Sequence, residues 1–311
     1  MMRAVVQDRF GGPEVLILGE LPDPEPGPTE ILVRVRAAGV NPVDWATRAG
    51  EGMFEEPPFV LGWDVAGVVE QVGVGVTRFR PGDDVFGMPR FPLQAGAYAE
   101  LVTGPSRQFA RQPTALDHVE AAALPLAGLT AWQILVDLAD VQPGQRVLVT
   151  AAAGGVGHLA VQIAKARGAF VIGTARAGKH DFLRRIGLDE PIDYTRTTVA
   201  DVVRDVDVVV DCLGGASSVD LMPVLRRGGL LVPVLGGVTP DIAAAAERYG
   251  VNACTLLVEP DGHALGELAA LAERGLLRPE IQATYDLADA ATAHEVGEQG
   301  RTRGKLVLTV D

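Results

Sequence analysis

Hydrophobic runs and polar punctuation divide this chain into stretches of different character. The first hundred residues contain short β-rich runs, separated by segments rich in Gly, Pro and Asp such as LPDPEPGPTE. These runs are 3–6, 15–18, 31–37, 65–72 and 97–103. Short strands at such spacing predict a β-rich, barrel-like unit.

The rhythm changes near residue 117. Asp117 can cap a helix over 118–141, which Pro125 breaks or kinks. Apolar runs then alternate with helical segments, and they predict strands at 146–150, 170–174, 192–194, 207–211, 228–235 and 253–259. Strands that alternate with helices indicate parallel βαβ units, here a doubly wound six-stranded sheet of the dinucleotide-binding kind.

The last fifty residues change character again. After a helix expected at 262–274 come one short helix and a terminal β run, KLVLTV. A lone strand is not stable by itself, so we expect it to pair with the N-terminal β unit. The chain is therefore predicted to be an α/β protein in which a nucleotide-binding domain, 117–282, is inserted into a β-rich domain made of 1–116 and 283–311.

Composition narrows the classes of partner and compartment. The 311 residues are 48% hydrophobic and 22% charged, with a net charge of −13, as in a globular protein whose acidic surface disfavours nucleic acid and anionic membranes. Two cysteines are too few for a disulfide framework. The start, MMRAVVQDRFGG, lacks the apolar core of a signal peptide, and no apolar run approaches the about 18 residues of a membrane span. We expect a cytoplasmic protein.

A glycine-rich turn, 152–157 (AAGGVG), lies between the first strand of the alternating series and the next helix. Gly154 and Gly155 would let backbone approach a pyrophosphate, and Gly157 would permit close helix–strand packing. Ala152 replaces the first glycine of the general G-x-G-x-x-G pattern, and such a match can also be only a turn. Its place in the series favours a dinucleotide site. We assign to that site Ala153, Gly154, Gly155, Val156 and Gly157, and from later loops Leu213, Gly214, Leu235 and Gly236.

The end of the second strand of that series predicts which nicotinamide cofactor binds. An acidic residue there would select NAD, but the strand runs into Ala175-Arg176-Ala177-Gly178-Lys179. Arg176 and Lys179 can bind the 2′-phosphate of NADP(H), and Tyr194 can lie beside it. Alternatively, the two cations are ordinary solvated charges at a helix start.

Taken with motifs elsewhere in the chain, these residues resemble the medium-chain dehydrogenase/reductase superfamily, in its zinc-independent quinone oxidoreductase branch. The motifs are FGGPEVL (10–16), AAGVNPVDWATRAG (37–50), LGWDVAGVVEQVG (61–73), RPGDDVFG (80–87), AGAYAE (95–100), LPLAGLTAW (124–132), AAAGGVG (151–157), DCLGG (211–215) and GKLVL (304–308). The resemblance implies a GroES-like β domain plus a Rossmann domain, an active site in the cleft between them, and a homodimer.

Zinc-dependent relatives place ligands at positions that in this chain are Asn41, Trp63 and Leu126. None of these can replace the cysteine and histidine ligands that catalytic zinc requires, and Asp64 alone is insufficient. The five histidines are scattered without ligand spacing. We therefore expect no metal.

Without a Lewis acid, the acceptor must itself delocalise the charge that hydride brings, as a quinone or an α,β-unsaturated carbonyl compound does. The resemblance implies that Asn41 donates a hydrogen bond to the acceptor oxygen, that Asp44 orients nearby groups and that Thr130 contacts the nicotinamide. Turn formation and helix packing are the alternatives for Asn41 and Thr130. Trp45, Phe54, Phe59, Trp63 and Phe91 are candidates for an apolar wall, or are plain core.

Two positions depart from the family pattern. Quinone oxidoreductases of this branch carry tyrosines where this chain has Ala46 and Gly52, and enoyl-thioester reductases use the second tyrosine as a proton donor. The leading hypothesis is NADPH-dependent reduction of a quinone or enone. The alternatives are an enoyl-thioester reductase and an NADPH-binding redox sensor without turnover.

Overall fold

A computed structural model describes residues 1–53 and 56–311, and by their contacts these residues form two compact units. The β unit comprises Met1–Leu129 and Glu259–Asp311, and the α/β unit comprises Thr130–Val258. The sequence placed the boundaries at 116/117 and 282/283, whereas 117–129 and 259–282 group with the β unit. The cause is packing: the helix at 118–122 and the helix at 262–273 both contact strands of the β unit.

The β unit contains a three-stranded sheet in the order β2-β1-β4 and a seven-stranded sheet in the order β15-β16-β3-β5-β6-β8, with β7 also paired to β3. Its strands are β1 (Met2–Gln7), β2 (Ile17–Leu21), β3 (Glu30–Val40), β4 (Phe59–Val60), β5 (Val65–Val72), β6 (Asp84–Gly87), β7 (Leu101–Pro105), β8 (Phe109–Arg111), β15 (Ile281–Asp286) and β16 (Lys305–Thr309). One buried apolar core lies beneath them, and its members include Ile31, Leu61 and Leu308.

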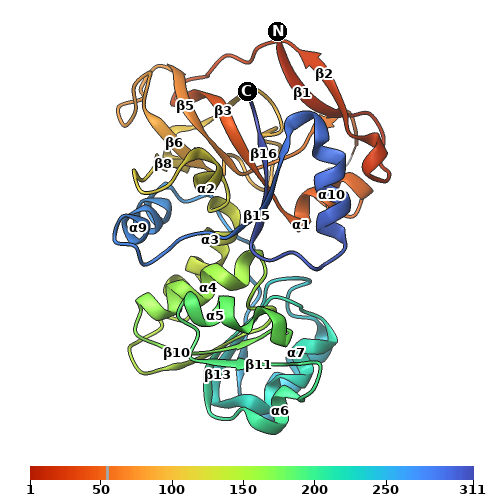
Figure 1. Ribbon diagram of the computed structural model, residues 1–311, viewed down its shortest axis with the longest axis vertical. Coiled ribbons are helices and arrows are strands. Elements are labelled where there is room, and N and C mark those ends of the chain that lie inside the picture. The colour runs from red at the N-terminus through yellow and green to blue at the C-terminus, as the bar shows by residue number, and fades with distance from the viewer. Residues whose placement is uncertain (54–55) are drawn as a thin grey trace. The chain divides into compact units, whose positions relative to one another are not determined.

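The last strand returns to the N-terminal β unit, as the sequence predicted. β16 pairs antiparallel with β3, so that Leu306 faces Val40, and it pairs in parallel with β15 on its other side. Figure 1 shows the blue β16 beside the orange-red β3. This pairing brings the start of β16 next to the end of β3, where helix α1 begins.

Helices of the β unit are α1 (Pro42–Ala49), α2 (His118–Ala122), α3 (Pro125–Trp132), α9 (Gly262–Glu273) and α10 (Ala290–Glu298), and the boundary between the units falls within α3. Helix α1 packs against α10, where Gly297 lies so close to Trp45 that a Cβ atom would be 2.6 Å from the indole ring. Pro125 begins α3, because proline lacks the N–H that an interior helical position would need.

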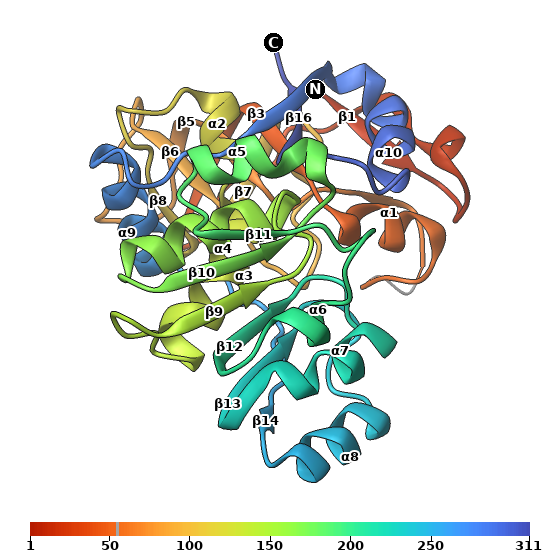
Figure 2. The same ribbon diagram turned by 60° about the horizontal axis from the view of Figure 1, so that its bottom comes forward.

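The α/β unit is built on a parallel sheet in the order β11-β10-β9-β12-β13-β14, which confirms the predicted six-stranded doubly wound sheet (Figure 2). Its elements are a π-helix (Gln133–Leu138), β9 (Arg146–Val149), α4 (Gly155–Ala166), β10 (Phe170–Thr174), α5 (His180–Arg185), β11 (Glu190–Ile192), α6 (Val199–Val202), β12 (Val206–Asp211), α7 (Ala216–Asp220), β13 (Leu225–Pro233), α8 (Pro240–Tyr249) and β14 (Asn252–Ala253). β14 is shorter than the run expected at 253–259, because its pairing with β13 ends at Ala253. None of the helices in the described part of the chain is long and apolar enough to cross a membrane.

Candidate functional site

The carboxyl ends of the parallel strands gather most of the residues that the sequence assigned to a cofactor. Loops follow β9, β10, β11, β12 and β13 at this edge, and they contain the glycine-rich turn, Arg176, Tyr194, Leu213-Gly214 and Leu235-Gly236. From β9 the chain continues to β10 and β11 on one side of the sheet, and from β12 it continues to β13 and β14 on the other side. The strand order therefore reverses between the neighbours β9 and β12, which is a topological switch point. Open α/β sheets bind ligands outside such a point. Thr130 lies elsewhere, in α3, and is 5% exposed.

The glycine-rich turn after β9 leads directly into a helix of three turns. Gly154 is the N-cap of α4, and its N–H donates to the carbonyl oxygen of Ala151 at 2.8 Å. Ala151 has a positive φ of 45°, a backbone conformation that residues other than glycine rarely adopt. A Cβ on Gly157 would lie 2.5 Å from the Ala151 oxygen, so only glycine lets the helix approach the turn this closely. The backbone and the free N–H groups at the start of α4 fit a pyrophosphate.

Arg176 and Tyr194 come together from different strand ends. The Nε of Arg176 donates to the hydroxyl oxygen of Tyr194 at 3.2 Å, and the Tyr194 side chain is 51% exposed. Lys179 ends a short helical turn, in which its own backbone N–H donates to the carbonyl oxygen of Arg176 at 2.9 Å. The structure thus places an exposed guanidinium and a phenol side by side where β10 and β11 end, with a lysine one turn later.

Asp211 shapes the loop that follows β12. This fully buried carboxylate accepts hydrogen bonds from the hydroxyls of Thr150 and Ser218, at 2.7 and 2.6 Å, and from the N–H groups of Leu213 and Gly214. Gly214 in turn lies against Leu235, since a Cβ atom there would be 2.3 Å from the Leu235 oxygen. Leu213 and Leu235, 55% and 48% exposed, therefore belong to two loops in mutual contact.

A second cluster of polar groups lies in the β unit, around the turn between β3 and α1. Asn41 is the N-cap of α1, and its N–H donates to Asp44 Oδ2 at 2.7 Å, since the side chain of the third helical residue commonly accepts from the N–H of the N-cap residue. Asn41 is 1% exposed and Asp44 is fully buried. Asp44 therefore fixes the backbone of Asn41, and the side-chain amide of Asn41 points toward other partners.

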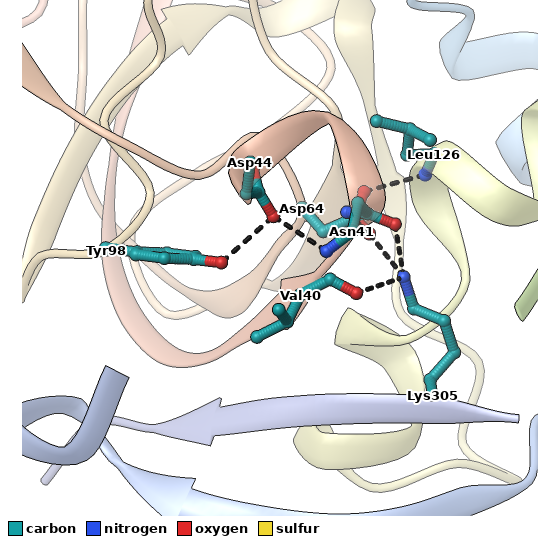
Figure 3. Close-up of polar contacts among 7 residues, drawn as sticks. All are labelled: Val40, Asn41, Asp44, Asp64, Tyr98, Leu126 and Lys305. Carbon is teal, nitrogen blue, oxygen red and sulfur yellow. Dashed lines mark hydrogen bonds and ion pairs between the residues drawn. The ribbon is translucent and has the colours of Figure 1, made fainter. Parts of the chain in front are cut away.

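Those partners are Asp64, from the segment before β5, and Lys305, the first residue of β16 (Figure 3). The Nδ2 of Asn41 donates to Asp64 Oδ2 at 2.8 Å, while its Oδ1 accepts from the ammonium of Lys305. Lys305 also donates to the Val40 carbonyl at 3.0 Å and lies 3.4 Å from Asp64 Oδ2. The Leu126 N–H donates to the other oxygen of Asp64 at 2.7 Å. A buried lysine and a buried aspartate thus hold the Asn41 amide between them.

On the other side of Asp44 runs a directed chain of hydrogen bonds. Arg48 can only donate, so it donates to Nδ1 of His294 at 3.1 Å, and Nε2 of His294 then carries the hydrogen that faces the Tyr98 oxygen at 3.2 Å. Tyr98 donates to Asp44 Oδ2 at 2.9 Å. Arg48 is also paired with Glu298 at 2.6 Å. The histidine is therefore neutral and structural.

Burial sets the protonation states of the side chains in this series of hydrogen bonds. Desolvation raises the pKa of Asp44 to about 7, against the lowering effect of its hydrogen bonds from Asn41 and Tyr98. It also lowers the pKa of His294 to about 3, assisted by the charge of Arg48, and raises the pKa of Tyr98 well above its usual value. Asp44 Oδ1 is buried without a hydrogen-bond partner among the described residues. An oxygen without a partner does not stabilise the ionised carboxylate, which agrees with the raised pKa of Asp44.

The residues at the zinc-ligand positions do not fit a metal. Asn41, Asp64 and Leu126 do gather, but the Asn41 amide and the Asp64 carboxylate bind an ammonium group, and Leu126 contributes only a backbone N–H to Asp64. Trp63 is fully buried and donates from its indole to the Leu93 carbonyl at 2.7 Å. Among the residues that the structure describes, no three His, Cys, Asp or Glu side chains are grouped as metal ligands.

The aromatic residues considered for a substrate wall belong mostly to the core. Phe59, Trp63 and Phe91 are 4%, 0% and 6% exposed, and Phe54 lies outside the described residues. Trp45 is partly buried against the core. Gly52, which replaces the family tyrosine, lies so close to Thr47 that a Cβ atom would be 2.3 Å from the Thr47 Cα. This backbone has no room for a tyrosine at position 52.

Sequence reasoning did not find Tyr98, His294, Arg48 or Lys305 as members of the cluster. The signal for Lys305 was present: the chain has three lysines against 24 arginines, and this one begins an otherwise apolar run, KLVLTV. Tyr98 lies in the motif AGAYAE, but its neighbours there are small residues that do not point to a partner such as Asp44 or His294.

Two family profiles match the chain. One is described as alcohol dehydrogenase GroES-like domain and covers residues 27–114, and the other is described as zinc-binding dehydrogenase and covers 186–308. Together they span most of both units.

Individual proteins match over the full length. The mouse mitochondrial NAD(P)H oxidoreductase RTN4IP1 is 31% identical over an alignment that covers 100% of this chain and 89% of the mouse protein. The quinone oxidoreductase of Coxiella burnetii is 36% identical with a TM-score of 0.94, covering 100% of this chain and 99% of that one. The CurK enoyl reductase is 26% identical with a TM-score of 0.90, over 100% and 99% of the two chains.

Proposed function

The chain belongs to the medium-chain dehydrogenase/reductase superfamily and is an oxidoreductase, and from this premise we propose that it uses NADPH to reduce a quinone or an α,β-unsaturated carbonyl compound without a metal. The observation that carries the proposal is the environment of Asn41. Where a Lewis acid would need ligands, this chain holds a buried Asn–Asp–Lys cluster. An acceptor that spreads the arriving charge onto its own oxygen needs hydrogen bonds to that oxygen rather than a Lewis acid, and the anion formed by hydride addition takes its proton from water.

Asn41 is the proposed donor to that oxygen. Its amide nitrogen carries two hydrogens, of which one is given to Asp64. The second has no acceptor among the described residues. Since Asn41 is 1% exposed, an acceptor must displace the atoms that cover it, and binding includes a local rearrangement.

The α/β unit supports binding of NADP(H). The turn at Gly154–Gly157 and the start of α4 would hold the pyrophosphate, and Arg176, Lys179 and Tyr194 would hold the 2′-phosphate. The loops of Leu213-Gly214 and Leu235-Gly236 would line the remaining edge. When bound, the reduced nicotinamide supplies the hydride.

Stopped-flow oxidation of NADPH with a panel of quinones and enones tests the proposal. We expect turnover with at least one class of acceptor, and we expect Asn41→Ala to lower kcat by about 100-fold, the usual effect of removing one hydrogen-bond donor to developing oxyanion charge. Tight NADPH binding without acceleration by any acceptor would refute the proposal and support an NADPH-binding protein without turnover.

A second candidate, reduction of an enoyl thioester, is favoured by the structural similarity to the CurK enoyl reductase. It is disfavoured by Gly52, where the backbone excludes the tyrosine that would donate a proton. Acyl thioesters belong in the same panel. A rate with an enoyl thioester that exceeds every quinone and enone would make this candidate the better one.

A further inference from the structure

We infer that Lys305 is a positioning residue: together with Asp64 it fixes which end of the Asn41 amide faces the acceptor. The inference rests on the proposed function, because it concerns the orientation of the group assigned there to the acceptor oxygen. It arises from three side chains brought together by β3, β16 and the segment before β5.

An asparagine side chain has two ends of nearly equal size and opposite hydrogen-bonding character. Rotation by a half turn exchanges a donor NH₂ for an acceptor oxygen, so packing alone does not select one orientation. If Asn41 presented its oxygen to a quinone or enone oxygen, two acceptors would face each other. A donor role for Asn41 therefore requires partners that distinguish its two ends.

Lys305 and Asp64 make this distinction. An ammonium group only donates, so the atom of Asn41 next to Lys305 must be Oδ1. An ionised carboxylate only accepts, so the atom next to Asp64, at 2.8 Å, must be Nδ2. Reversing the amide would place N–H against ammonium and oxygen against carboxylate. The pair thereby leaves one hydrogen on Nδ2 for a further acceptor.

The same contacts argue that Lys305 does not itself supply a proton to the substrate. Its three hydrogens have three acceptors, which are the Val40 carbonyl, Asn41 Oδ1 and Asp64 Oδ2, and the side chain is 3% exposed. The charges of Lys305 and Asp64 also balance each other in the interior, which a buried ion requires. Lys305 therefore acts through Asn41.

The use of lysine at this position is unusual for this chain. It contains 24 arginines and three lysines, and the other two lysines, Lys165 and Lys179, lie in the α/β unit and are more exposed. A compact ammonium fits among three oxygen atoms that surround one point, whereas the planar fork of a guanidinium does not.

The first test compares Lys305→Met with the double variant Asp64→Asn, Lys305→Met. The single change leaves a buried carboxylate without its counter-ion, which can impair folding. The double change leaves no net charge. The new amide at position 64, whose oxygen accepts from the Leu126 N–H, would present its NH₂ to Asn41 and so favour the reversed orientation of the Asn41 amide. We expect the double variant to fold, to bind NADPH within about twofold of wild type, and to lose kcat by about tenfold or more, the effect of one misdirected hydrogen bond in the transition state. The matched control is Arg303→Met, two positions before Lys305, which removes an exposed ion pair with Glu280 and should retain kcat.

The second test observes the amide directly. The chain contains two asparagines, Asn41 and Asn252, so selective ¹⁵N-asparagine labelling gives two side-chain NH₂ signals, with Asn252 as internal reference. We expect the Asn41 pair to shift or broaden in the double variant while the Asn252 pair stays in place. In wild-type protein labelled with ¹⁵N-lysine, the ammonium hydrogens of Lys305 should exchange slowly enough to be seen at neutral pH, unlike those of Lys165 and Lys179.

The outcomes separate the two hypotheses. If Asn41→Ala leaves kcat unchanged, the proposed role of Asn41 fails and this inference fails with it. If Asn41→Ala lowers kcat but the folded double variant retains it, or if its Asn41 signals do not change, Lys305 does not orient the amide. Rapid exchange of the Lys305 ammonium in the wild-type protein contradicts the inference without any variant.

Discussion

The guanidinium of Arg176 donates to the hydroxyl of Tyr194 at 3.2 Å, so residues that follow two different strands form one polar corner at the carboxyl edge of the parallel sheet. Arginine has five N–H donors, and the bond to Tyr194 uses one of them. The others can bind a phosphate, with the phenol fixing the plane of the guanidinium.

Replacing Arg176 and Lys179 together by alanine is expected to raise the Kd for NADPH by about tenfold or more, because charge-assisted hydrogen bonds to the 2′-phosphate are lost. The Kd for NADH should stay nearly unchanged. Fluorescence titration of both cofactors measures this, with Arg184→Ala, an exposed residue paired to Asp181, as the control. An equal loss for the two cofactors would show that the cations do not read the 2′-phosphate.

Gly157→Ala is expected to weaken NADPH binding by about tenfold or more. The new methyl group would lie 2.5 Å from the Ala151 oxygen and 2.8 Å from the Ala152 Cα, so the turn before α4 must move. Gly266→Ala is the matched control, since it lies in α9 with no atom within 4 Å of its Cβ position, and alanine there should raise the free energy of unfolding by up to about 1 kcal/mol. Cofactor titration and urea unfolding measure the two effects; unchanged NADPH affinity in Gly157→Ala would contradict the close approach of helix and turn.

Tyr98→Phe is expected to lower the free energy of unfolding by about 1–3 kcal/mol, because buried groups of Asp44 and His294 both lose their shared partner. Urea unfolding followed by circular dichroism measures the loss. Tyr249→Phe, at a residue 38% exposed, should change little. Equal stability of the two variants would mean that the Tyr98 hydroxyl does not join Asp44 to His294.

Asp44→Asn is expected to change how stability depends on pH. Burial raises the pKa of Asp44 from 3.8 to about 7, so between these values the native state keeps a proton that the unfolded state has released. Wild type should therefore lose up to about 4 kcal/mol of unfolding free energy, relative to the variant, as the pH rises from about 4 to about 7, with no further loss above that range.

The measurement is a series of urea unfolding curves for both proteins across this range. The contribution of His294, whose lowered pKa acts in the opposite direction at acidic pH, is present in both and cancels in the difference. Parallel pH profiles would show that Asp44 is not a buried titrating group.

The sequence was informative where structure is decided locally. Strand–helix alternation predicted the six-stranded sheet, and the glycine turn and Arg176 could be proposed as cofactor residues because their motifs are short and contiguous. The domain boundary was placed differently, because the grouping of α2 with the β unit depends on long-range contacts, such as the packing of α2 on β3 and β5.

The buried cluster could not be predicted for the same reason. Lys305 and Asn41 are 264 positions apart, and Tyr98 and His294 are 196 positions apart. Only the pairing of β16 with β3 and the packing of α10 on α1 bring these side chains together. In the sequence, the lysine that begins the apolar run KLVLTV was the feature that could have indicated a buried charged group.

The return of β16 to β3 also orders events during synthesis. The α/β unit is continuous, Thr130–Val258, and can fold as soon as it has left the ribosome, because domains generally fold as units during translation. The β unit must wait for β16, which lies between β3 and β15 in the larger sheet and follows both of them in the sequence. Until that strand arrives, the pairing edge of β3 is open to other chains, and the carboxylate of Asp64 has no counter-ion. A chain cut before Lys305 would therefore have one complete domain and one sheet with an unpaired strand edge.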